Sequence, residues 1–297
     1  MRNSLRQTMQ SGFTLVEVMV AGALFALVGG IAYYIMTAGT VLYAKNYSIN
    51  SSGGALRAGL DRINAEVSQA TDMPQLVTLN GSGGFTTQAI VAGATAGIGP
   101  AAGIIFDKYL GGPYIMEGTG AATATTFSMK RSTNPRVIAP IPSADDVVLI
   151  DGSDNRSRVS TASGGVISSQ LQSISVTLKS GNSSGIAWVA GDKKPATLVR
   201  RVAFIIVGNE LRYYPTMEGA TTYTTSATPY SVLTTDVGTS SGEATPFSIV
   251  IKNTEPFLSL SFRVQNRDNN SVLTKKEAKD FNTSMRIDTL LRPRNAQ

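Results

Sequence analysis

The strongest constraint on this chain is an apolar run near its N-terminus, over residues 13–36. The run holds one charged residue, Glu17, and as a helix it would reach roughly 36 Å at about 1.5 Å per residue. A hydrocarbon core is about 30 Å thick, so the run is long enough to span a membrane. Arg2 and Arg6 precede it without any acid, and the positive-inside rule therefore predicts a cytoplasmic N-terminus.

A cleaved secretory signal is the alternative interpretation of this run. Such signals have a shorter apolar region, about 7–15 residues, and the glutamate inside this one is atypical of them. The Ala-x-Ala pattern at residues 21–23 falls in the middle of the run, and no proline occurs before Pro74. The pattern favours a membrane-spanning helix that continues beyond the membrane.

Apolar residues recur at helical spacing after the run. They are spaced four, three, four and three apart, which is typical of one buried helix face. The residues in this stripe are Leu56, Leu60, Ile63, Val67 and Ala70. Arg62 and Glu66 are spaced to form an ion pair on the exposed face, and Pro74 ends the element. We expect a helix over 13–72, with 13–36 in the membrane and 37–72 amphipathic.

The composition excludes several classes of site. The chain has no Cys and no His, which excludes Cys/His zinc sites and catalysis by histidine bases or cysteine nucleophiles. The net charge of +6 is spread without a Lys/Arg block, so no nucleic-acid partner is indicated. We therefore expect a protein that is not an enzyme and needs no cofactor.

Short strand patterns separated by turn residues fill residues 73–297. Alternation is clearest at 173–179 and 257–265, and 198–214 is typical of a hairpin around Gly208 and Asn209. Further strands are expected at 103–106, 125–130, 147–150, 247–252 and 284–291. This pattern predicts an α+β fold, with the long N-terminal helix packed on a mainly antiparallel β head.

The residues around Glu17 carry a resemblance to a known family. Residues 11–18 read Ser-Gly-Phe-Thr-Leu-Val-Glu-Val, after a short basic leader and before the apolar helix. This arrangement resembles the processing motif of type IV pilins and type II secretion pseudopilins. The resemblance covers about the first 40 residues, and it implies a pilin-like fold.

The resemblance implies a role for each matching residue. Residues 1–12 would be the prepilin leader, cut off between Gly12 and Phe13 by prepilin peptidase, with methylation of the Phe13 amine. Glu17 would accept the N-terminal ammonium of a neighbouring subunit. The implied partners are the peptidase, other pilin or pseudopilin subunits, an inner-membrane assembly platform and the lipid itself.

The helix exit, over residues 57–70, is similar to that of the large minor pilins, the W-type pilin and J-type pseudopilin class. The chain lacks the helix proline of many major pilins, and without Cys it cannot form their disulfide. The resemblance therefore implies a minor subunit of a type IV pilus or a secretion pseudopilus. It would be single-pass in the inner membrane with a periplasmic head, and would then join a periplasmic or extracellular filament.

Two alternatives concern the head. It could be a membrane-anchored adhesin or carbohydrate-binding domain that uses a pilin-type anchor. A calcium site is a second alternative, since Asp151 and Asp154 lie in an acidic, turn-rich stretch with Asp145 and Asp146. Their spacing fits no EF-hand pattern, and we therefore expect solvated turn residues there.

Overall fold

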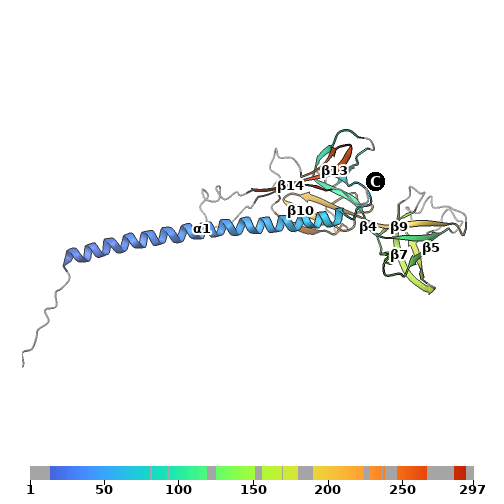
Figure 1. The fold of residues 1–297 in the computed structure, drawn as a ribbon, viewed down its shortest axis with the longest axis horizontal. Helices are drawn as coiled ribbons and strands as arrows, with labels where there is room; N and C mark the ends of the chain where they lie inside the picture. The colour runs from blue at the N-terminus through green and yellow to red at the C-terminus, as the bar shows by residue number, and fades with distance from the viewer. Residues whose placement is uncertain are drawn as a thin grey trace, which may run out of the picture. The chain divides into compact units, whose positions relative to one another are not determined.

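The computed structural model describes residues 14–80, 82–91, 94–118, 125–150, 156–168, 170–179, 190–223, 228–235, 237, 246–265 and 284–291. These residues form one long helix, α1 (Leu15–Val67), and fourteen strands (Figure 1). The chain divides into two compact units, residues 1–51 and 52–297. A long apolar helix followed by a mainly antiparallel β domain confirms the predicted α+β class.

The strands belong to two sheets, and each pairing within them is antiparallel. The larger sheet contains β1 (Gln75–Leu79), β2 (Phe85–Gln88), β4 (Gly103–Glu117), β5 (Thr126–Ser132), β6 (Val147–Ile150), β7 (Arg156–Ser168), β8 (Leu171–Leu178), β9 (Lys193–Val207), β10 (Glu210–Tyr214) and β11 (Ser231–Thr234). The smaller sheet contains β3 (Ile98–Ala101), β12 (Phe247–Lys252), β13 (Glu255–Gln265) and β14 (Ser284–Leu291).

Six strands of the larger sheet close into a barrel. In order around the ring they are β4, β5, β8, β7, β6 and β9, and the pairing of β9 with β4 closes it. Apolar side chains fill the interior, as expected for a small barrel. They include Tyr114, Met116, Phe127, Met129, Ile174 and Val176. Closure leaves these six strands without a free edge along their barrel segments.

The strands β4 and β9 connect the barrel to the open part of the sheet. Each has 15 residues, a length of roughly 50 Å, and they pair from Gly103 opposite Ile205 to Glu117 opposite Lys193. One end of this ladder lies in the barrel, and the other is flanked by β1 and β10. The open part of the sheet therefore has the order β11, β10, β9, β4, β1, β2.

Alternate residues of β9 supply two different cores, because side chains alternate across a strand. Phe204 and Ile206 belong to a core shared with α1 and the smaller sheet. Ala203 and Ile205 point to the opposite face, where Met217 and Tyr223 cover them. Both faces of the open sheet are therefore buried at this strand, which explains its nearly continuous apolar sequence.

The predicted helix stripe lies in the first of these cores. Leu56, Ile63, Val67 and Ala70 are all buried, and Leu60 is partly buried against the same cluster. Their partners include Phe204 of β9 and Leu260 of β13. This part of α1 belongs to the second unit, and it is held there by apolar burial.

The helix ends at Val67, before the predicted end at residue 72. The backbone beyond it bonds to β4 instead of continuing the helix. The Thr71 amide donates to the Asp107 carbonyl over 2.9 Å, and the Tyr109 amide donates to the Gln69 carbonyl over 2.8 Å. The neighbouring strand therefore ends the helix before Pro74 can.

The predicted strands at 147–150, 247–252 and 284–291 occur with the predicted bounds, as β6, β12 and β14. The hairpin is confirmed as β9 and β10, with Val207 opposite Glu210. The other predicted strands occur with shifted ends, and β4 is much longer than 103–106. The sequence patterns missed β1, β2, β3, β7 and β11.

The turn between β12 and β13 gives a testable prediction on stability. Asn253 and Thr254 form its two-residue loop with φ angles of 51° and 67°, and a β-branched residue is strained there. We expect Thr254→Gly to raise the free energy of unfolding by about 0.5–1 kcal/mol, measured by thermal unfolding of the detergent-solubilised chain. Thr86→Gly in β2, which has no strain to relieve, should lower it. A lower free energy of unfolding in both variants would contradict the assignment of strain to Thr254.

Candidate functional site

The N-terminus of α1 is capped by a reciprocal set of hydrogen bonds between Thr14 and Glu17. The Thr14 hydroxyl accepts from the Glu17 amide over 3.2 Å. In return Glu17 Oε2 accepts from the Thr14 amide over 3.0 Å and from the Thr14 hydroxyl over 3.1 Å. This arrangement is a capping box, which satisfies helix-end amides that lack an acceptor within the helix. Glu17 is therefore already hydrogen-bonded in the single chain.

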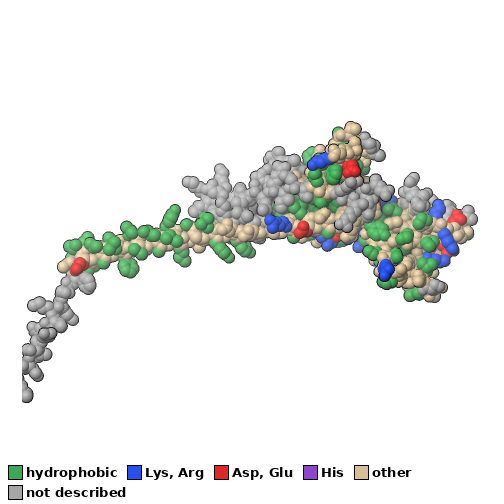
Figure 2. All heavy atoms as spheres, in the orientation of Figure 1, with side chains coloured by type: hydrophobic (Ala, Val, Ile, Leu, Met, Phe, Trp, Pro, Cys, Tyr) green, Lys and Arg blue, Asp and Glu red, His purple; other side chains and the backbone are tan. Residues whose placement is uncertain are grey.

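The first half of α1 exposes its apolar side chains. Large hydrophobic residues between Leu15 and Met36 are more than half exposed, up to 85% for Phe25. Figure 2 shows such side chains all along this part of the helix. Residues 15–44 have a mean hydropathy of 2.2, and α1 is the one described helix long and apolar enough to cross a membrane. A bilayer or other apolar helices would cover this surface.

The other four candidate residues from the sequence analysis lie outside the part of the chain that the structure describes. Gly12 and Phe13 lie outside the described residues, and so do Asp151 and Asp154. Of the five candidate residues, the structure places Glu17 alone. The described residues contain no group of three or more acidic side chains that could hold a metal ion.

The acidic pair Asp145 and Asp146 is not a set of solvated turn residues, contrary to expectation. Asp146 is 2% exposed, and its Oδ1 accepts from Arg200 over 2.7 Å. Asp145 Oδ1 accepts from Arg158 and from Lys179, the latter over 2.6 Å. Each carboxylate therefore already has a cationic partner from a strand of the barrel. Among the basic residues that alternate along β7, Arg158 was the sequence signal for the Asp145 pair alone.

The Lys179 hydrogen bond lowers the pKa of Asp145 below its usual value, and it outweighs the opposing effect of partial burial. Arg158 lowers the pKa further through a hydrogen bond and its charge. A carboxylate in this setting stays ionised at neutral pH and serves as a fixed anion.

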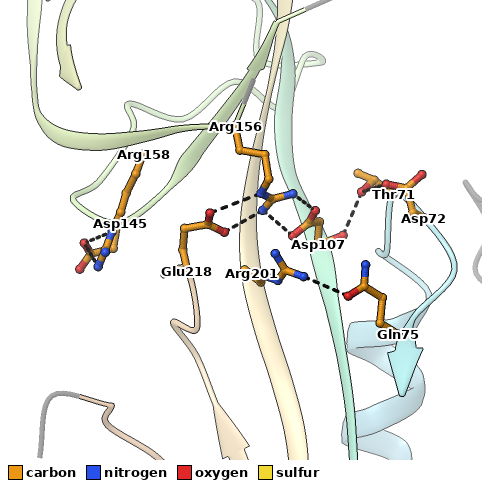
Figure 3. A network of polar contacts seen from close by, with 9 residues as sticks. All are labelled: Thr71, Asp72, Gln75, Asp107, Asp145, Arg156, Arg158, Arg201 and Glu218. Atoms are coloured by element: carbon orange, nitrogen blue, oxygen red, sulfur yellow. Dashed lines mark hydrogen bonds and ion pairs between the residues drawn. The ribbon is translucent and has the colours of Figure 1, made fainter. Parts of the chain in front are cut away.

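A second ion-pair network connects the barrel to the open sheet (Figure 3). Arg156 on β7 donates two hydrogen bonds to the Asp107 carboxylate of β4, one of them from Nη2 over 2.8 Å. It also donates to Glu218 from Nη2 over 2.8 Å. Burial alone would lower the pKa of Arg156, but the bonds to Asp107 and Glu218 raise it above its usual range. One guanidinium thus joins three segments of the chain.

The comparisons with known proteins bear on the N-terminus. Residues 7–33 match the family model for the prokaryotic N-terminal methylation motif. The chain carries a prepilin-type methylation motif. The match includes the predicted cut between Gly12 and Phe13 and the capping pair Thr14 and Glu17, and it ends inside the apolar half of α1. No curated protein and no solved structure matches the chain.

The methylation motif implies processing by prepilin peptidase, and with the apolar helix it indicates membrane anchoring. Type IV pilins and pseudopilins, which bear this motif, are generally structural subunits without enzymatic activity. The match covers none of the β head, whose description rests on the structure alone.

The Arg156 network gives a second prediction on stability. Arg156→Met keeps an unbranched side chain but leaves Asp107 and Glu218 without their shared cation. We expect the free energy of unfolding to fall by roughly 1.5–3 kcal/mol, the range for hydrogen bonds to charged groups. Chemical denaturation of the detergent-solubilised chain measures it, with the exposed Arg136→Met as the matched control. Equal losses in the two variants would show that the network contributes nothing specific.

The lowered pKa of Asp145 predicts a dependence on pH. A carboxyl group with a lower pKa in the folded state stabilises it above the unfolded value, 3.8, and this contribution disappears as pH falls through the folded value. Asp145→Asn should therefore cost stability at pH 7, by under about 1 kcal/mol because the pair is partly exposed. The difference in stability between Asp145→Asn and wild type should shrink below about pH 4. Melting temperatures from pH 7 to pH 3 measure this, and a deficit that grows in acid would contradict it.

Proposed function

We propose that this chain is a structural subunit, a minor pilin or pseudopilin, of a type IV pilus or a type II secretion pseudopilus. It is made as a prepilin, cut between Gly12 and Phe13, and methylated on the Phe13 amine. Its N-terminal helix then carries it from the inner membrane into a filament, with the β head in the periplasm or outside the cell. The processing peptidase, the assembly platform, membrane lipid and other subunits are its partners.

One observation carries this proposal: the methylation motif runs directly into a helix whose large apolar side chains are exposed over residues 15–36. An anchor that only holds a domain at a membrane needs no carboxylate within its apolar run. Glu17 lies inside this run, where an unpaired charge is costly, so the chain requires a cationic partner for it. The ammonium of a neighbouring subunit's Phe13 would supply one.

The size and connectivity of the head support a minor subunit over a major one. A β domain with an inserted barrel is a large body to repeat along a tightly packed fibre. The stretch at 57–70, similar to the large minor pilins, ends in contacts with β4. Assembly would then depend mainly on the helix, and the head would be free to differ among subunits.

Processing is the first test of the proposed function. Expressed with prepilin peptidase, the full chain should yield a mature protein that begins at Phe13 and carries an N-terminal methyl group. Mass spectrometry of the membrane-purified protein measures both. Cells without the peptidase are the control and should retain Met1. A chain that keeps Met1 beside an active peptidase would refute the proposal.

The charge of Glu17 is tested separately from its hydrogen bonds. Glu17→Gln keeps an acceptor for the Thr14 amide, because Gln also completes a capping box, but removes the negative charge. We expect it to be cut and yet to reach sheared filaments at least tenfold less than wild type. Asp61→Asn removes an exposed acid of the same helix and is the matched control. Incorporation of Glu17→Gln at the wild-type level would remove the pairing role.

A further inference from the structure

The Thr14 hydroxyl makes most of the capping hydrogen bonds at the start of α1, and the methylation motif alone does not explain why. Of the three hydrogen bonds in the capping box, two use this hydroxyl. We infer that Thr14 is a positioning residue for prepilin cleavage: its capping box starts the helix at Leu15 and so keeps the Gly12–Phe13 bond outside the helix. This inference rests on the proposed function, and it concerns the precursor before assembly.

The reasoning starts from the amides at the helix end. The first turn of a helix has amides with no acceptor inside the helix, and an apolar surrounding makes each unpaired donor costly. These amides can bond to a capping side chain, or the helix can lengthen upstream until preceding carbonyls accept them. The Thr14 hydroxyl and the Glu17 carboxylate provide the first solution for the amides of Glu17 and Thr14.

Loss of the hydroxyl favours the second solution. The nearest upstream residue with a capping side chain is Ser11, three positions before Thr14. A helix capped there would include both Gly12 and Phe13, and the Gly12 carbonyl would accept from the Val16 amide by the i, i+4 rule. Gly12 opposes this extension, because glycine is a poor helix former. The threonine and the glycine therefore act in the same direction.

A helical scissile bond is a poor protease substrate. Peptide bonds are cut where the backbone is exposed and free of internal hydrogen bonds, so a helical bond must first unwind. The capping box removes that step by ending the helix before the bond. It also assigns Glu17 two separate tasks. One carboxylate oxygen, Oε2, makes the capping bonds, and the negative charge remains for pairing with an incoming ammonium.

The test compares initial cleavage rates of the full-length precursor in membranes that contain prepilin peptidase, by pulse–chase. Thr14→Val keeps the shape of threonine and loses the two hydroxyl bonds. We expect it to be cut roughly fivefold more slowly, the effect of removing a typical N-cap side chain. Thr14→Ser restores a hydroxyl and should recover most of the rate. Thr37→Val, which removes a hydroxyl bonded to the Tyr33 carbonyl within the same helix, is the matched control.

Hydrogen exchange on the same full-length, uncut chain in detergent supplies a readout independent of cleavage. The Leu15 and Val16 amides, which the capping box does not bond, should become protected in Thr14→Val, because the Ser11 and Gly12 carbonyls would then accept from them. In wild type and Thr14→Ser these two amides should exchange quickly.

Several outcomes overturn the inference. It fails if Thr14→Val is cut at the wild-type rate, if Thr37→Val is slowed equally, or if the Leu15 and Val16 amides of Thr14→Val exchange as they do in wild type. Failure of wild type to be cut at all refutes the proposed function instead, and hydrogen exchange then still decides whether Thr14 determines where the helix begins.

Discussion

The ladder between β4 and β9 is the interaction on which the head depends. Its two strands contribute to all three apolar cores, because Ile104 and Phe106 face one core, Ile105 another and Tyr114 and Met116 the third. A single pair of long strands therefore sets the register of the barrel and of the open sheet together. A one-residue slip would turn every one of these side chains to the wrong face.

Three consecutive residues of β4 connect this ladder to the rest of the head. Lys108 pairs with the buried Glu66 of α1 over 2.7 Å, Asp107 accepts from Arg156 of the barrel, and the Tyr109 amide bonds to the chain just beyond the helix. Glu66 also pairs with Arg62, whose guanidinium lies over the Tyr213 ring at 5.1 Å. The end of the helix and the barrel are thus both attached to one short stretch of strand.

The features that could be predicted from the sequence are those with strong local periodicity. The apolar run, the stripe from Leu56 to Ala70 and the β9–β10 hairpin each carry such a pattern, and each occurs in the structure. The strand β7 could not be predicted, because it is rich in Ser and Gly and is held by its neighbours in a closed ring. At the site, Glu17 was identified, but the role of Thr14 depends on side-chain geometry. The burial of Asp146 depends on Arg200, distant in sequence, and no local pattern reveals such a pairing.

The barrel is a segment of chain whose two ends lie side by side on the paired strands β4 and β9. The chain enters the barrel along β4 at Gly111 and returns along β9 at Leu198, and these two residues lie opposite each other in the ladder. A segment whose ends are already neighbours can be replaced by a tight turn or by another domain without moving the strands that remain. The core that holds the helix involves none of the barrel's interior side chains. The barrel is thus a separable module, which can change without altering the core that holds the helix.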